Sequence, residues 1–147
     1  TMLRLHPDVG LLYSGASVSH SISGNHPEAI RLAEKGVMLE SGTPFSLLAL
    51  AQAHAYAGNQ ARARTLLNDA EASDKYQCPY ETAVVYILLD DVDKAFDLFN
   101  QAVAYRSNCL VFTRNDVRLA PIKLDPRYDA LLTRIGLNDD AIAKLPK

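Results

Sequence analysis

The strongest constraint on the fold of this sequence is an internal repeat of about 34 residues. The pair Gly24-Asn25 recurs as Gly58-Asn59. A third copy follows after about 32 residues, where Ala95 takes the place of Ala63. A period of this size is typical of arrays in which each copy is one supersecondary unit that packs on its neighbours.

The second half of each copy has apolar or small residues at i, i+3, i+4 and i+7, the spacing of one buried helical face. These positions are Ala29, Leu32, Ala33, Gly36, then Ala63, Leu66, Leu67, Ala70, then Ala95, Leu98, Phe99, Ala102. Each copy therefore predicts two helices. We expect helical hairpins at approximately 8–40, 44–73 and 79–105.

Boundary residues favour the same division. Thr43-Pro44 combines an N-cap residue with a proline at the first helical position. Small residues occupy matching positions in the three first helices, at Ser17, Ala51 and Ala83, where they allow two helices to approach closely. The apolar run 84–89 is β-prone by itself, but it is in register with two helices. We therefore predict an all-α fold.

The C-terminal third departs from the repeat. Residues 106–124 are irregular, with Pro121 as a helix breaker, and we expect them to wrap the last hairpin as short turns. Residues 125–137 predict a helix, with apolar residues on one side at Tyr128, Leu131, Leu132, Ile135 and Leu137. A stack of hairpins ends in an open apolar face, so this segment is predicted to be a capping helix.

Period, small-residue positions and helix pairing together resemble the tetratricopeptide repeat. The segments 79–86 and 125–137 look like the last repeats of tails fused to bacterial winged-helix transcriptional regulators, class III adenylate cyclases and serine/threonine kinases. The resemblance implies an alpha-alpha superhelix that serves as an interaction or regulatory segment. Pro7 stands where a preceding repeat would close. We expect residues 1–147 to form a single domain that is a piece of a longer protein.

In that family the first helices line a concave groove. By the repeat register the groove residues here are Leu11, Val18, Ile22, Phe45, Leu48, Gln52, Tyr56, Tyr80, Val84 and Leu88. The family's carboxylate clamp of Lys, Asn and Arg is missing at these places. We expect an apolar groove for a hydrophobic peptide or helix, with Phe45, Tyr56 and Tyr80 as anchors. The alternative is that these side chains bury against a neighbouring helix, an upstream domain or a second copy.

Charge and motifs disfavour other functions. The formal net charge is −2, so no global field attracts nucleic acid or an anionic membrane. No apolar run approaches the roughly 20 residues of a membrane span.

The two cysteines, Cys78 and Cys109, are too few for a disulfide framework. We expect both side chains to pack in the ordinary way, and we expect a reducing, cytoplasmic location. His20 and His54 are predicted to pack in the core rather than to bind metal.

The sequence contains no catalytic motif, and we expect neither enzymatic activity nor a cofactor. The predicted function is a scaffold that binds a protein partner, or another part of its own chain, within a bacterial signalling or transcriptional regulator. The groove could also join two copies as a homodimer. The alternative function is a free-standing chaperone of a bacterial secretion system.

Overall fold

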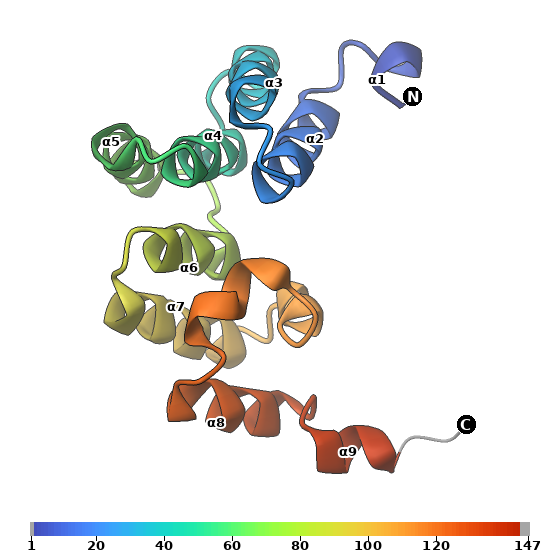
Figure 1. Ribbon diagram of the computed structural model, residues 1–147, viewed down its shortest axis with the longest axis vertical. Helices are drawn as coiled ribbons and strands as arrows, with labels where there is room; N and C mark the ends of the chain where they lie inside the picture. The colour runs from blue at the N-terminus through green and yellow to red at the C-terminus, as the bar shows by residue number, and fades with distance from the viewer. Residues whose placement is uncertain (1, 145–147) are drawn as a thin grey trace. The chain divides into compact units, whose positions relative to one another are not determined.

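The computed structural model describes residues 2–144. The chain divides into two compact units; the first ends at Gln77 and the second begins at Cys78. All regular elements between residues 2 and 144 are helices, without a strand among them (Figure 1). The predicted all-α fold built from helical hairpins is confirmed. That the chain is a single domain and a piece of a longer protein stays a prediction.

The first unit contains two hairpins. One pairs α2 with α3, the other pairs α4 with α5, and α4 also packs against both α2 and α3. The bounds are α1 (Met2–Leu5), α2 (Gly10–Ile22), α3 (His26–Leu39), α4 (Pro44–Tyr56) and α5 (Gln60–Glu71). These hairpins agree with the predicted ranges to within a few residues.

The second unit contains one hairpin and its cap. α6 pairs with α7, the 3-10 helix η2 packs against α6, and α8 packs against α7. The bounds are α6 (Pro79–Leu88), α7 (Val92–Ala104), η1 (Asn108–Phe112), η2 (Val117–Ile122), α8 (Pro126–Ile135) and α9 (Asp139–Ala143). The predicted capping helix is confirmed as α8, and the irregular segment before it folds as two 3-10 helices.

The predicted inner faces of the second helices form the core. Ala29, Ala63 and Ala95 are fully buried at matching places in α3, α5 and α7. Leu98 is the exception among the predicted positions, because it is only half-buried. The three-and-four spacing thus identified the buried face of each helix from sequence.

Turns and caps follow local chemistry. Gly24 and Gly58 end the first helices of their hairpins with φ of 81° and 82°, a region where a side chain costs energy. Asp90 takes the same left-handed conformation in the third hairpin, with φ of 60°, which aspartate tolerates better than most residues. The Thr43 hydroxyl accepts a hydrogen bond from the Ser46 amide, as expected for an N-cap.

Helices α2 and α3 approach closely at Gly36. A Cβ atom on Gly36 would lie 2.6 Å from Ser14 Oγ and 3.3 Å from the carbonyl oxygen of Gly10. The buried face of α2 presents Ser14, Ser17 and Ser21, whose hydroxyls have no hydrogen-bond partner within residues 2–144. Small side chains on both helices therefore set this contact.

Candidate functional site

Three of the predicted groove residues form an apolar stripe on α2. Leu11, Val18 and Ile22 are spaced i, i+7 and i+11, so they share one face of the helix. Leu11 and Ile22 are exposed, and Val18 is half-buried. The buried serines Ser14, Ser17 and Ser21 lie on the adjacent side of the helix. Within the first unit, this stripe lies at the surface.

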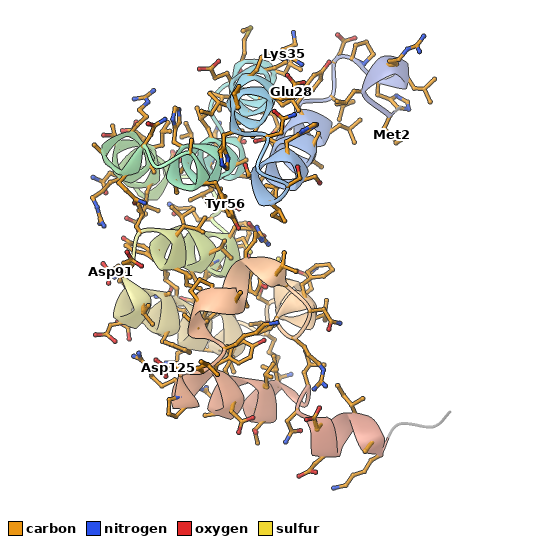
Figure 2. All side chains as sticks on the ribbon, in the orientation of Figure 1. Met2, Glu28, Lys35, Tyr56, Asp91 and Asp125 are labelled. Atoms are coloured by element: carbon orange, nitrogen blue, oxygen red, sulfur yellow. The ribbon has the colours of Figure 1, made fainter. Side chains whose placement is uncertain are left out.

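The four predicted groove residues on α4 differ in exposure. Phe45 is exposed at the start of the helix. Tyr56, which is labelled in Figure 2, is half-buried at its end. Leu48 and Gln52 are each only 1% exposed. Buried side chains present no area to a partner, so the prediction of Leu48 and Gln52 as partner contacts is wrong. The predicted role of Phe45 and Tyr56 as anchors stays a prediction.

In the second unit the predicted groove is covered. Tyr80 and Val84 are 0% exposed, and Leu88 is half-buried. The Tyr80 ring packs edge-on against Phe99, with centroids 5.6 Å apart. The prediction of Tyr80 and Val84 as partner contacts is wrong here. The physical reason is that η2 packs against α6, on the face that the repeat register assigned to a ligand.

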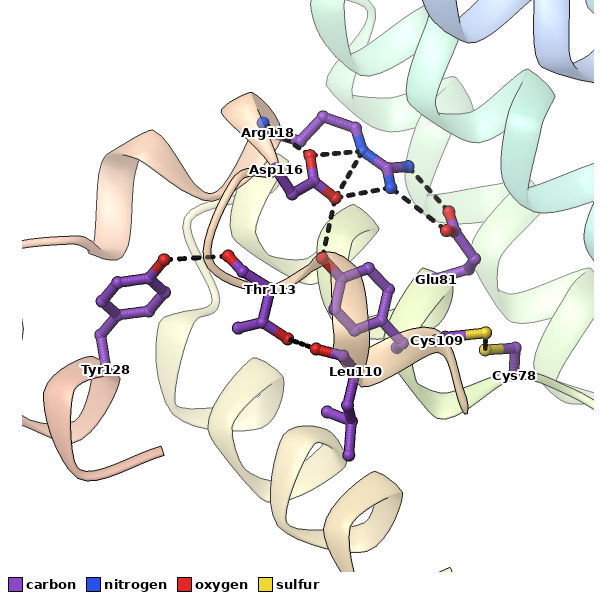
Figure 3. A network of polar contacts seen from close by, with 9 residues as sticks. Cys78, Glu81, Cys109, Leu110, Thr113, Asp116, Arg118 and Tyr128 are labelled. Carbon is purple, nitrogen blue, oxygen red and sulfur yellow. Dashed lines mark hydrogen bonds and ion pairs between the residues drawn. The ribbon is translucent and has the colours of Figure 1, made fainter. Parts of the chain in front are cut away.

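A buried polar network joins η2 to the first turn of α6 (Figure 3). Arg118 Nη1 donates to Glu81 Oε2 at 2.8 Å, and its Nη2 donates to Asp116 Oδ2 at 2.7 Å. The Tyr80 hydroxyl donates to the same Asp116 oxygen at 2.8 Å. The Arg118 side chain is only 11% exposed. One guanidinium therefore binds two carboxylates from segments far apart in the sequence.

The charges of this network reinforce one another. Burial acts to raise the pKa of Asp116, but hydrogen bonds and charge from Arg118 outweigh it and lower that pKa. Burial acts to lower the pKa of Arg118, and Asp116 and Glu81 raise it overall. Burial, followed by the charge of Asp116, raises the pKa of Tyr80. The network therefore consists of one guanidinium bound by the carboxylates of Asp116 and Glu81, with the Tyr80 hydroxyl as a further donor, an arrangement suited to holding the cap in place.

Stability in acid should depend on Asp116. Because its folded-state pKa lies below the ordinary 3.8, its contribution is present above about pH 4 and is lost as pH falls through the folded-state pKa. We expect the wild-type free energy of unfolding to fall more steeply below pH 4 than that of Asp116→Asn. Urea denaturation at a series of pH values measures both slopes. Asp97→Asn, an exposed carboxylate on α7, is the control and should keep the wild-type slope; equal slopes for all three proteins would contradict this assignment.

The same device occurs a second time at α8. The Asp125 carboxylate accepts from the Arg127 amide at 2.9 Å, and Arg127 Nη1 donates to Asp93 of α7 at 2.7 Å. The Arg127 guanidinium also lies over the Phe96 ring, 4.3 Å from its centroid. This copy is open to solvent, since the Arg127 side chain is 47% exposed. Two Asp-x-Arg motifs thus tether η2 to α6 and α8 to α7.

A pocket of about 400 Å³ lies in the second unit beside α7, η1 and α8. Five apolar side chains, two arginines and one serine line it: Val103, Arg106, Ser107, Leu110, Val111, Arg134, Ile135 and Leu137. Arg134 Nη1 donates to Asn100 Oδ1 at 2.5 Å, which holds its guanidinium at the pocket. An apolar concavity with a few polar groups is the usual form of a binding site.

No sequence pattern predicted this pocket. Leu110 and Val111 belong to a short apolar run, 109–112, inside the segment without helical periodicity. Ile135 and Leu137 were expected to cover the hairpin with the rest of the capping helix, but both are only half-buried. The available signal was the apolar run itself, because apolar residues clustered in an irregular segment need a surface against which to pack.

The histidines and acidic residues within positions 2–144 do not form a metal site. Across the described part of the chain, no group of three or more His, Cys, Asp and Glu side chains is placed to hold a metal ion.

None of the helices in the described part of the chain is both long enough and apolar enough to cross a membrane. His54 is half-buried, and burial lowers its pKa. Asn59 Nδ2 lies 3.3 Å from His54 Nδ1.

Comparison with family models, with curated proteins and with solved structures finds no match to this chain. The resemblance to the tetratricopeptide repeat therefore stays a prediction. The fold and the site define an all-α protein of helical hairpins, with a pocket beside the cap of its second unit.

Proposed function

We propose that this chain is a non-enzymatic helical-repeat module of the tetratricopeptide type that binds a helix or peptide of a protein partner. The observation on which the proposal depends is the pocket beside α7, η1 and α8. Its five apolar side chains suit burial of an apolar partner side chain, as in helix-in-groove recognition. The proposed role in a bacterial signalling or transcriptional regulator, in the cytoplasm, is supported by the resemblance of the repeats alone.

The charge of the pocket favours an acidic partner segment. Arg106 and Arg134 both line it, and both are exposed. A carboxylate next to the partner's apolar anchor could pair with either guanidinium, which adds specificity and accelerates association. The expected ligand is therefore an amphipathic helix with leucines on one face and glutamates beside them.

The apolar stripe on α2 supports the same class of function. Exposed apolar side chains that share one helix face are typical of contact surfaces. Leu11, Val18 and Ile22 provide such a face in the first unit. The partner can be a separate protein or another domain of the same polypeptide.

Synthetic peptides test the proposal directly. The probes are fluorescent helical peptides of about four turns with leucines at i, i+3, i+4 and i+7, flanked either by glutamates or by lysines. Fluorescence anisotropy should show saturable binding of the glutamate peptide and at least about tenfold weaker binding of the lysine peptide. Val111→Asp should weaken the binding of the glutamate peptide by about tenfold or more, because it places a negative charge on the pocket wall next to the negative peptide.

Val117→Asp is the matched control. Val111 and Val117 are valines of similar exposure, 64% and 57%, on the two 3-10 helices, but only Val111 lines the pocket. The control should bind as the wild type does. An equal effect of both substitutions, or no binding of the glutamate peptide by the wild type, would remove the pocket from the proposed function.

A further inference from the structure

The two cysteines of the chain meet within the second unit. Cys78 is the N-cap residue of α6, and Cys109 is the second residue of η1. They are 31 positions apart in the sequence, yet their sulfur atoms lie 3.1 Å apart (Figure 3). Both residues are half-buried and both are free thiols. We propose that Cys78 and Cys109 form a reversible disulfide when the protein meets a two-electron oxidant such as hydrogen peroxide or glutathione disulfide.

The bond requires little movement. A disulfide has a sulfur–sulfur distance of about 2.05 Å, so the two sulfurs must approach by roughly 1 Å. Neither cysteine lies in the middle of a long helix. Cys78 has an extended backbone before Pro79, and Cys109 belongs to a five-residue 3-10 helix. Any backbone adjustment would therefore fall at the start of α6 and within η1, outside the interior of α6 and α7.

The chemistry balances with either oxidant. With glutathione disulfide, one cysteine sulfur attacks and releases one glutathione; the second sulfur attacks the mixed disulfide and releases the other. Two S–H bonds are lost, one S–S bond forms, and the oxidant is reduced to two thiols. With hydrogen peroxide, one sulfur becomes a sulfenic acid that condenses with the other thiol, and two waters leave in all.

The protonation state of Cys109 affects the rate of oxidation. Burial, followed by the neighbouring Cys78, raises the pKa of the Cys109 thiol, and the charge of Glu81 acts in the same direction. The thiolate is the reactive form. Oxidation that begins at the Cys109 sulfur should therefore be faster at mildly alkaline pH than at neutral pH.

The disulfide has a structural consequence that does not depend on the proposed function. It closes a loop that contains α6, α7 and part of η1, and it fixes η1 to the start of α6. A cross-link of this kind restricts the unfolded chain. The oxidised protein should therefore unfold at a Tm several degrees higher than the reduced protein.

Mass spectrometry of the intact protein tests the inference. The purified chain is reduced, exchanged into buffer at mildly alkaline pH, treated with glutathione disulfide, and then exposed to an alkylating reagent. We expect a monomer two hydrogen atoms lighter that takes up no alkyl group, formed at a rate independent of protein concentration. Dithiothreitol should restore two alkylatable thiols. Persistent alkylation of both cysteines, stable glutathione adducts, or disulfide-linked dimers alone would overturn the proposal.

A matched variant separates proximity from general reactivity. Cys109→Ser combined with Val111→Cys keeps two cysteines in the second unit and keeps one of them on η1. Residue 111 is exposed and lines the pocket, whereas Cys109 contacts Cys78. This variant should form the intramolecular disulfide at least about tenfold more slowly. Equal rates in the two proteins, with circular dichroism unchanged, would show that the contact between Cys78 and Cys109 has no special role.

Discussion

Replacing Arg118 with alanine is expected to lower the free energy of unfolding of the second unit by about 3 to 5 kcal/mol. The substitution leaves the carboxylates of Asp116 and Glu81 without the guanidinium that binds both. Asp116 and Glu81 are 7% and 17% exposed at their side chains, so water replaces the lost charge poorly. Removing one partner of a buried ion pair destabilises the fold by more than the intact pair stabilised it, because the remaining charge is left buried.

Urea denaturation of the full chain, with hydrogen exchange of peptides from α6 and η2, measures this loss. Arg127→Ala is the matched control, because it removes the same Asp-x-Arg arrangement at a site where the arginine is 47% exposed. Water screens that ion pair, and the loss should be much smaller. Losses of equal size would show that burial does not decide the strength of these two networks.

Replacing Gly36 with leucine should destabilise the first unit by about 3 kcal/mol. Even the Cβ atom would lie 2.6 Å from Ser14 Oγ and 3.3 Å from the backbone of α2. Leucine is a good helix former, so about 1 kcal/mol of helix propensity would be gained and would offset part of the loss. The remaining loss arises from forcing α2 and α3 apart.

Gly15→Leu is the control for helix propensity. Gly15 also lies within a helix, but its Cβ would meet no atom within 4 Å. This variant should be as stable as the wild type or more stable by up to about 1 kcal/mol. Hydrogen exchange of α2 and α3 should increase only in the Gly36 variant. If Gly36→Leu unfolds at the wild-type urea midpoint, the close contact of α2 and α3 does not constrain this position.

The helices could be predicted because their signals are local. The spacing of Ala63, Leu66, Leu67 and Ala70 defines the buried face of α5 without any knowledge of what covers it. Gly24 and Gly58 end their helices through their own backbone freedom. The repeat register placed Gly36 with Ala70 and Ala102, but only the structure shows that this position has no room for the methyl group that the other two have.

The site was predicted less well because it depends on the aperiodic segment. The repeat register assigned Tyr80 and Val84 to a groove, because the resemblance to the tetratricopeptide repeat assumes that one face of each first helix is open to a partner. In the structure η2 packs against that face, and Tyr80 donates to Asp116 instead of contacting a partner. The predictions for Leu11, Val18, Ile22, Phe45, Tyr56 and Leu88 stay predictions.

Periodicity and capping residues are properties of neighbouring positions, and from them alone follow the all-α class, the three hairpins and the capping helix. The meeting of Cys78 with Cys109, the pairing of Arg118 with Glu81 and the pocket beside α8 join positions far apart in the chain. No local pattern specifies such contacts. Each depends on how the segment of η1 and η2, whose sequence has no helical periodicity, packs against the α6–α7 hairpin. Tertiary packing decides them.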